Sequence, residues 1–397
     1  MKKTICNIEN CTGCAACRDI CPKECISMQP DELDALYPII NTDKCINCGL
    51  CEQTCPNNTS LNFRYPQKVW AAWSKEEIVR KTSASGGVAC ELYKHWLDIG
   101  GVGFGVIYDI NEGCHFKLIE KEADIEAVKN SKYTFSNTNG IYKIVKQKLN
   151  IGIPVLFIGV PCQIAGLLGY LKKDYENLFT VDIICHGMPP VTYLQQHIAK
   201  LEQKTRKTAK RLSFRDPEFG TNTFTFTLRD DSNKLLYKKK VLNTDNYQLS
   251  YHRALIYREN CYSCKYARRE RLADLTIGDF SGIGRISPFH FSNHNISCIL
   301  QNTNKGSELL SKLNTALTLV ERPILEALNY EKQLNSPSIK HSKRNIFERE
   351  YRSSKNFNNA ANKALCKEKV IAIKTALVLK VKLFLYNIFV FCGLKKR

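Results

Sequence analysis

The chain has 397 residues, of which 44% are hydrophobic, so it can bury two to three packed domains and is neither disordered nor fibrous. Its formal net charge is +20. The lysines and arginines are spread over the second half without an aromatic-interleaved motif, which argues against a nucleic-acid site and for a basic surface that meets acidic partners or anionic lipid. The 19 cysteines come without an apolar export segment at the start, so we expect a reducing, cytoplasmic location in which thiols bind metals.

Two cysteine runs near the start share the spacing C-x2-C-x2-C-x3-C followed by proline, and they repeat at an interval of roughly 34 residues. This is the bacterial ferredoxin spacing, in which three cysteines of one run and the last cysteine of the other hold one 4Fe-4S cluster. The ligands expected for the first cluster are Cys11, Cys14, Cys17 and Cys55. Those expected for the second are Cys45, Cys48, Cys51 and Cys21. Zinc favours two separated pairs of ligands, and disulfides have no reason to repeat such a run.

Residues 1–64 are therefore predicted to form a dicluster ferredoxin domain of the bacterial type. Cys6 and Cys25 fall outside the expected ligand sets, and we expect Cys25 to be a small packing residue.

The next region, residues 65–150, begins with a strand-like apolar segment and continues into a helix expected from Val88 to Leu97. Small residues precede this helix, namely Ser83, Ala84, Ser85, Gly86 and Gly87. Backbone amides at such a helix start can bind a phosphate, but an N-cap with flexible glycines explains the same pattern. Strands over 101–109 and 115–120 and a charged helix over 121–129 should follow. The loop 131–137, which contains Lys132, could hold a phosphate or a ring or could be an ordinary surface loop.

Residues 151–335 have the pattern of an α/β unit. A continuous apolar run, 154–160, predicts a strand covered on both faces, and it leads into a helix that contains Cys162. A second strand, 179–184, ends at Cys185. If these strands are parallel, both cysteines lie at the same carboxyl edge of the sheet, where open α/β folds bind ligands. Residues 205–245 alternate in the manner of an antiparallel insertion.

Two further cysteines, Cys261 and Cys264, form a C-x2-C pair. Together with Cys162 and Cys185 they would complete either a third cluster or a zinc site, and unpartnered buried cysteines are the third interpretation. His186 follows one of these cysteines and is expected to have a structural role. No residue stands out as a catalytic acid or base.

Beyond residue 336 the composition shifts to Lys, Arg, Asn and Ser, which is typical of a solvated linker or a loosely packed helix, so 336–397 is expected to be a basic linker followed by an amphipathic helix. The uncharged apolar run near the end, 383–394, is shorter than the ~20 residues of a membrane span. A basic amphipathic helix over 370–397, lying on the inner membrane face, is the preferred interpretation, and docking onto the core or a partner is the next.

Five segments in this order resemble the beta subunit of the coenzyme F420-reducing hydrogenase and dehydrogenase family: SASGGV, SKYTFS, GVPCQIAGLLGYL, DIICHGMPP and CYSCKY with LADLTIGDFSG. The resemblance spans about residues 70–335. The same module is similar to the flavin-bearing core of chlorophyll-cycle hydroxymethyl reductases. The expected fold is an N-terminal ferredoxin fold, an α/β flavoprotein core with a mixed sheet and a C-terminal amphipathic helix.

The resemblance implies an iron-sulfur flavoprotein oxidoreductase, with FAD in the core and a 4Fe-4S cluster held by Cys162, Cys185, Cys261 and Cys264. Carried over in the same way, the residues implied at the flavin are Ser85, Gly86, Gly87, Lys132 and Asp279. Relatives with a ferredoxin unit in front are familiar in bacteria and are often encoded with polysaccharide-synthesis proteins. The expected partners are a low-potential electron donor or acceptor protein and an organic substrate. Two alternatives are a cluster-bearing electron-transfer adaptor without flavin and a non-catalytic partner of a polysaccharide-synthesis machinery.

Overall fold

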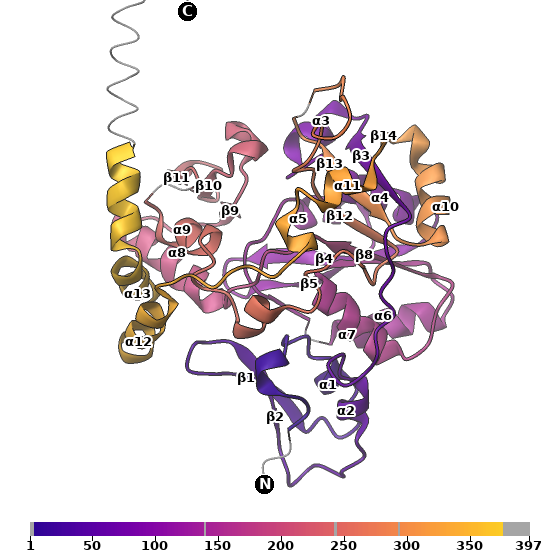
Figure 1. Cartoon of the computed structure of the whole chain (residues 1–397). Helices are drawn as coiled ribbons and strands as arrows, with labels where there is room; N and C mark the ends of the chain where they lie inside the picture. The colour runs from indigo at the N-terminus through magenta and orange to yellow at the C-terminus, as the bar shows by residue number, and fades with distance from the viewer. Residues whose placement is uncertain (1–3, 139, 242–243, 293, 376–397) are drawn as a thin grey trace, which may run out of the picture.

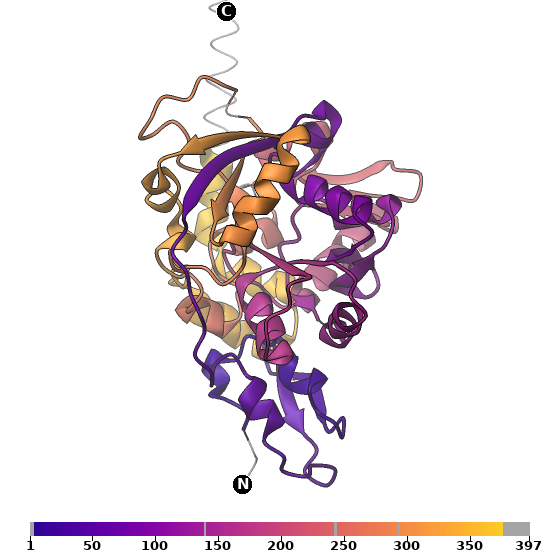
Figure 2. The ribbon, with the colours of Figure 1, turned by 90° about the vertical axis from the view of Figure 1, so that its right-hand side faces the viewer.

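The computed structural model describes residues 4–138, 140–241, 244–292 and 294–375. A small N-terminal unit, drawn in indigo in Figure 1, lies against one end of a larger α/β core. The core contains a wide mixed sheet, and a second group of short strands and helices lies beside it. Figure 2 shows the same arrangement from the side, with the N-terminal unit projecting beyond the core. The mixed α/β architecture with a ferredoxin-like unit in front agrees with the expected fold class.

The N-terminal unit, residues 4–64, has little regular structure because its cysteine runs occupy most of its length. Its elements are η1 (Ile8–Asn10), α1 (Ala16–Asp19), β1 (Ile26–Pro30), β2 (Leu36–Ile40) and α2 (Leu50–Thr54). The strands β1 and β2 form an antiparallel hairpin. Both short helices contact α7 (Pro161–Leu171) of the core. The unit is therefore joined to the core through a helix that itself contains one of the predicted cluster ligands.

Among the described residues, nine strands form the main sheet in the order β14-β3-β13-β12-β8-β7-β4-β5-β6. Their bounds are β3 (Lys68–Ser74), β4 (Val102–Asp109), β5 (Gly113–Ile119), β6 (Ser136–Asn137), β7 (Val155–Gly159), β8 (Leu178–Ile183), β12 (Leu275–Asp279), β13 (Ser297–Gln301) and β14 (Leu317–Arg322). The strands β4, β7, β8 and β12 run parallel to one another. The predicted parallel pairing of β7 and β8 is confirmed, so their carboxyl ends meet at one edge.

Every residue of β7 is buried because helices cover both faces of the sheet. Phe157 packs with residues of α6 (Ile141–Asn150) and α7 on one face. Leu156 packs with residues of α4 (Val88–Asp98) and α10 (Asn304–Lys312) on the other. This alternation explains the continuous apolar run of the sequence. The remaining elements around the sheet are α3 (Glu77–Thr82), η2 (Glu122–Asp124), α5 (Ile125–Val128), η6 (Leu313–Thr315), α11 (Ile324–Leu328) and η7 (Lys332–Leu334).

A second, three-stranded antiparallel sheet is inserted between β8 and β12, as the alternating sequence over 205–245 predicted. Its strands are β9 (Arg211–Ser213), β10 (Phe226–Arg229) and β11 (Leu235–Lys239). The elements around it are α8 (Val191–Thr205), η3 (Pro217–Phe219), η4 (Thr221–Thr223), α9 (Asn246–His252) and η5 (Glu259–Ser263). Their apolar side chains share a separate buried group centred on Tyr193, Phe226 and Tyr247.

The structure differs from the expected linker in the region after residue 336. Two helices, α12 (Arg344–Ser354) and α13 (Phe357–Ala364), pack onto α8 and α9, and the side chains of Phe347, Tyr351 and Phe357 are fully buried there. The composition of this region is polar, but its buried residues recur at helical spacing and therefore form one apolar face on each helix. A membrane-surface helix is predicted over 370–397. From residue 376 onward this segment lies outside the described residues. In the described ranges, no helix is long and apolar enough to cross a membrane.

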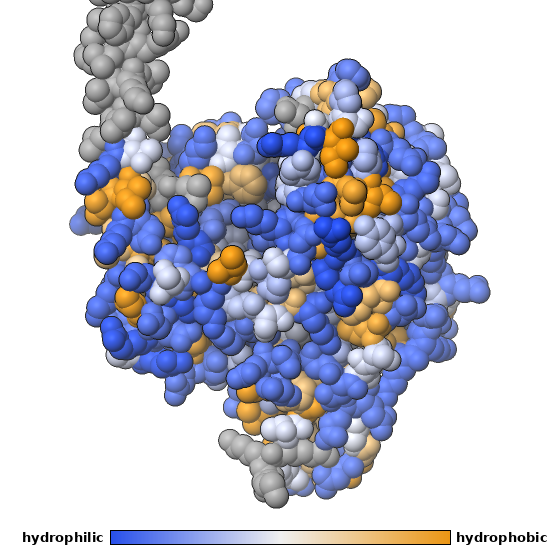
Figure 3. All heavy atoms as spheres, viewed as in Figure 1, coloured by the Kyte–Doolittle hydropathy of each residue, from blue (hydrophilic) through white to orange (hydrophobic). Residues whose placement is uncertain are grey.

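Figure 3 shows the face of the molecule seen in Figure 1. Most of this face is hydrophilic, and small hydrophobic patches are scattered over the core and the N-terminal unit.

Candidate functional site

Four cysteines of the N-terminal unit line one cavity, which we name the inner cavity. They are Cys11, Cys14, Cys17 and Cys55, the set expected for the first cluster, and Cys6 lies beside them. All four are buried, with Cys14 packed into the core of the larger domain. The spacing therefore brings three cysteines of the first run and the last cysteine of the second run to one place.

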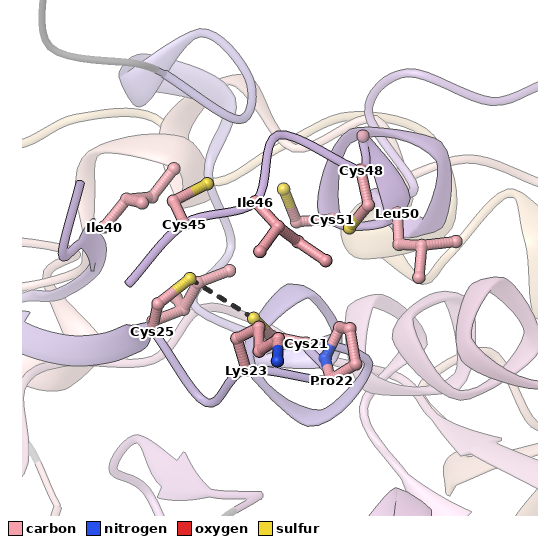
Figure 4. Close-up of a pocket in the computed structure, with 12 residues that line it drawn as sticks. Cys21, Pro22, Lys23, Cys25, Ile40, Cys45, Ile46, Cys48, Leu50 and Cys51 are labelled. Atoms are coloured by element: carbon pink, nitrogen blue, oxygen red, sulfur yellow. Dashed lines mark hydrogen bonds between the residues drawn. The ribbon is translucent and has the colours of Figure 1, made fainter. Parts of the chain in front are cut away.

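The other expected set lines a second cavity, which we name the outer cavity. Its cysteines are Cys21, Cys45, Cys48 and Cys51, with Cys25 in addition. Figure 4 shows Cys21 and Cys25 together on one side and Cys45 and Cys51 on the facing segment. The Sγ atoms of Cys21 and Cys25 lie 3.3 Å apart. Cys48 is exposed, whereas all four cysteines of the inner set are buried.

A third cavity, the core cysteine cavity, brings together Cys162, Cys185, Cys261 and Cys264. Cys162 lies in the first turn of α7, just after β7, and Cys185 follows β8. Cys261 lies in η5, and Cys264 comes directly after it. Because β7 and β8 are parallel, both strand-end cysteines reach the same sheet edge, and the C-x2-C pair closes the site from the other side.

The donor chemistry of the cysteine cavities suits iron-sulfur clusters. In the described part of the chain, no three His, Cys, Asp or Glu side chains converge closely enough to hold one metal ion. A zinc ion needs thiolates about 2.3 Å from a single centre, whereas a 4Fe-4S cube is bound by four thiolates on separate irons. The four cysteines that line the core cysteine cavity are the number of thiolates that such a cube requires.

The thiols differ in how readily they ionise. A hydrogen bond from the Cys6 thiol is the main cause that lowers the pKa of Cys11 to about 6 and that of Cys55 to about 7. Burial raises the pKa of Cys261 to about 11 and also raises the pKa of Cys162. Thiolates are the ligands of iron, so metal binding at the core cysteine cavity must release more protons.

The largest cavity, of about 600 Å³, lies at the carboxyl edge of the parallel strands and is of the size found at small-molecule sites, ~300–1,000 Å³. It is lined by most of the residues implied at the flavin, namely Ser85, Gly87, Lys132 and Asp279. Segments far apart in the sequence thus meet at one site: the start of α4, the loop after α5, and the ends of β7, β8 and β12. We name it the large cavity.

Gly86 does not line the large cavity but holds its wall in place. A Cβ atom at this position would lie 2.2 Å from the carbonyl oxygen of Ala72, so only glycine fits. The Gly86 amide donates to the hydroxyl of Ser297, and the Ser85 hydroxyl donates to the carbonyl of Ile296. This close packing fixes the start of α4, whose first amide groups face the cavity and favour an anion.

Lys132 and Asn130 lie at the same end of the large cavity. Desolvation lowers the pKa of Lys132 to about 8, and its Nζ donates to the carbonyl oxygen of Lys129 at 2.6 Å. The buried side-chain oxygen of Asn130 has no hydrogen-bond partner among the described residues. A helix start and a lysine together suit the phosphate end of a nucleotide cofactor, and the Asn130 oxygen can accept a hydrogen bond from a hydroxyl or amino group of such a ligand.

The large cavity is also lined by two residues that belong to no sequence motif, Arg215 and His252. Arg215 comes from the inserted sheet region and donates to Asp279 at 2.7 Å. His252, from α9, has a pKa lowered to about 4, mainly by burial and then by His186 and Arg215. His186 lines the cavity but is not placed by the structure in a catalytic role. No spacing rule connects Arg215 and His252 to Asp279, so the sequence carried no signal for them.

The large cavity and the core cysteine cavity share one wall. The segment from Cys185 to Met188 lines both of them. Cysteine ligands and the expected flavin residues are thus separated by a few residues of backbone at the end of β8.

Two family models match parts of this chain. Residues 154–326 match the family model for the C terminus of the coenzyme F420 hydrogenase/dehydrogenase beta subunit, and residues 10–59 match the 4Fe-4S dicluster domain. A solved chain of the F420-reducing [NiFe] hydrogenase complex from Methanosarcina barkeri is similar over 78% of this chain and 94% of its own, at 17% identity and a TM-score of 0.41. No curated protein matches.

Proposed function

We propose that the protein is an iron-sulfur flavoprotein oxidoreductase, because residues 154–326 match the family model for the C terminus of the coenzyme F420 hydrogenase/dehydrogenase beta subunit and residues 10–59 match a 4Fe-4S dicluster domain. In this proposal it transfers electrons between a partner redox protein and an organic substrate. It binds three 4Fe-4S clusters and one FAD.

The observation that carries the proposal is the succession of four cavities. The outer and inner cavities take up the two ferredoxin cysteine sets, and the inner one adjoins the core because Cys14 packs among the residues of α7. The first turn of α7 contains Cys162 of the core cysteine cavity, and this cavity shares a wall with the large cavity. Redox groups held at these places form one continuous series from the surface to the carboxyl edge of the sheet.

When bound, the clusters supply one-electron transfer and FAD supplies the two-electron chemistry that an organic substrate needs. The residues of the chain bind and orient these groups. We propose the four cysteines around each cysteine cavity as the cluster ligands. At the large cavity, the start of α4 and Lys132 bind the pyrophosphate. Arg215, Asp279 and His252 line the same cavity, and we propose them as the residues that a substrate at the ring would meet.

The outer cavity is the proposed point of electron exchange with the partner protein. It is the cysteine cavity with an exposed cysteine, and Ile46 beside it is 58% exposed. The proposal does not specify the organic substrate. Coenzyme F420, which the family description names, and an intermediate of polysaccharide synthesis are the two candidates to assay.

The experiment that tests the proposal is anaerobic purification followed by measurement of iron, sulfide and flavin. About twelve irons and one FAD per chain are expected. In the Cys185→Ala variant the iron content should fall by about four, because one core ligand is lost. Cys298→Ala is the matched control, since Cys298 is also buried but lines none of the cysteine cavities.

A content of about eight irons without flavin in the wild type contradicts the proposal and supports an electron-transfer adaptor. Full iron and flavin contents without turnover of any electron donor or acceptor support a non-catalytic partner instead.

A further inference from the structure

Arg258 is a buried cation at the boundary between the N-terminal unit and the core. Its side chain is 1% exposed, and its Nη2 donates to the carbonyl oxygens of Leu36 and Cys11, at 2.9 and 3.3 Å. The guanidinium lies between the rings of Tyr37 and Phe135, with its Cζ 5.0 and 4.9 Å from the two ring centres. Across the described ranges, no carboxylate pairs with it, and its Nη1 has no hydrogen-bond partner.

Such an environment is costly for a cation. Two carbonyls and two aromatic faces offset part of the desolvation, but a buried charge without a counter-charge normally costs several kcal/mol. The other buried arginines differ in this respect: Arg271 pairs with Asp182 and Arg344 pairs with Glu348. The structure around Arg258 is therefore incomplete without an anion.

Arg258 is hydrogen-bonded to cysteines of two cavities. Its Nη2 donates to the carbonyl oxygen of Cys11 at 3.3 Å, and its own carbonyl oxygen accepts from the amide of Cys261 at 3.0 Å. Cys11 belongs to the inner cavity and Cys261 to the core cysteine cavity, so Arg258 lies between the two.

Tyr266 provides a second unpaired donor at this boundary. Its ring is buried among the residues that surround Cys14 and Cys162, and it lines the core cysteine cavity. Its hydroxyl is buried and has no hydrogen-bond partner in the part of the chain that the structure describes. A buried hydroxyl is rarely left unpaired, because its desolvation is then uncompensated.

We propose that Arg258 and Tyr266 serve the two clusters that meet at this boundary, the one of the inner cavity and the one of the core cysteine cavity. Arg258 supplies the counter-charge and Tyr266 a hydrogen-bond donor. A cluster bound by four thiolates is an anion and becomes more negative on reduction, so both residues favour the reduced form and raise the reduction potential. They are positioning residues for electron transfer between the N-terminal unit and the core. This inference rests on the proposed function.

Tyr266→Phe is the conservative test, because only the hydroxyl is removed. Redox titration of the holoprotein, followed by electron paramagnetic resonance, should show that the core cluster is reduced about threefold less favourably than in the wild type. Tyr108→Phe is the matched control, because the Tyr108 hydroxyl is also buried and unpaired among the described residues but lines no cysteine cavity. Its three clusters should titrate as in the wild type.

Arg258→Gln removes the charge and should make reduction of the inner cluster at least tenfold less favourable, about 59 mV for a one-electron couple. Arg258→Lys keeps the charge and should restore most of the difference. Arg344→Gln controls for the loss of a buried arginine elsewhere. The outer cluster is an internal control in every sample, since the carbonyl groups to which the Arg258 side chain donates are those of Cys11, in the inner set, and Leu36.

Unchanged potentials of the inner and core clusters in Tyr266→Phe and in Arg258→Gln overturn this inference and leave the proposed function intact. If Arg258→Gln does not accumulate as a folded protein, the potential of the core cluster in Tyr266→Phe alone decides whether the inference holds. Wild-type protein without clusters overturns both proposals, and the iron measurement made before the titration detects this outcome.

Discussion

The two halves of the N-terminal repeat have the same cysteine spacing but opposite surroundings. Cys14 is 9% exposed and packs against the core, whereas its equivalent in the second run, Cys48, is exposed. The neighbouring positions differ in the same way, since Thr12 is 7% and Ile46 58% exposed. The spacing thus specifies which residues can bind a cluster. The packing decides which cluster faces the rest of the protein and which faces a partner.

The largest expected effect comes from removing one cysteine from each half. Cys14→Ser should lose about four irons and also lower the free energy of unfolding by about 1–3 kcal/mol, because it places a hydroxyl in a buried apolar group. Cys48→Ser should lose about four irons with a smaller loss of stability. Iron analysis and thermal unfolding of both variants measure this difference. Equal loss of stability would show that the burial contrast has no energetic consequence.

Gly166→Ala tests the contact between the inner half and α7. A Cβ at this position would lie 2.8 Å from the Tyr142 hydroxyl and 3.0 Å from the Cys14 Sγ, so the helix or the cysteine must move. We expect a loss of about 1–3 kcal/mol in unfolding free energy and slower reduction of the core cluster through the N-terminal unit. Stopped-flow absorbance and denaturant unfolding measure the two effects. Gly152→Asn is the control, because no atom lies within 4 Å of a Cβ there and asparagine tolerates the positive φ.

Lys132→Gln tests whether FAD binding in the large cavity is independent of the two cysteine sets of the N-terminal unit. The variant should bind FAD about tenfold less tightly while the iron content stays unchanged. In the wild type, FAD affinity should fall as the pH rises above about 8, because the lysine then loses the charge that holds the phosphate. Fluorescence titration from pH 7 to 10 measures this dependence. A pH-independent affinity in the wild type contradicts the phosphate assignment.

In FAD-free protein, Lys132 affects stability in the opposite direction: a rise in pH weakens FAD binding but increases the contribution of Lys132 to the stability of the folded chain. Its pKa is lowered from 10.5 to about 8 on folding, so the unfolded chain binds more protons between these values. Its contribution to stability therefore rises with pH over this window.

The smallest effect is expected at the surface. Ile46→Glu should slow reduction by an external donor protein several-fold, without changing iron content or stability, because it alters only the contact face of the outer cavity. Ile8→Glu is the matched control on the inner half, since Ile8 is 57% and Ile46 58% exposed. A larger effect at Ile8 than at Ile46 contradicts the proposed direction of docking.

Much of the fold and of the site was predictable from local pattern. The cysteine spacing indicated the shared sets of the N-terminal unit, the apolar run over 154–160 indicated a strand covered on both faces, and the parallel strands explain why Cys162 and Cys185 meet. These signals work because spacing and periodicity are local properties of the chain.

The rest depends on packing between distant segments. Arg258 and Tyr266 carry no motif, and their unpaired atoms are visible only once the N-terminal unit and the core are in contact. Gly86 was expected at the flavin, yet its position is determined by the approach of the Ala72 carbonyl. The helices α12 and α13 were missed because polar residues outnumber the apolar ones. The spacing of Phe347 and Tyr351, four residues apart, was the available signal.

The helix α12 and the residue that follows it also hold the N-terminal hairpin. The Tyr351 hydroxyl donates to Asp34 at 2.6 Å, and Lys355 donates to the carbonyl of Glu32 at 2.6 Å. These hydrogen bonds join segments separated by more than 300 positions, so they fix the hairpin of the ferredoxin unit to the rest of the molecule. During translation, the hairpin can form these two contacts only after residue 355 of the 397 has left the ribosome.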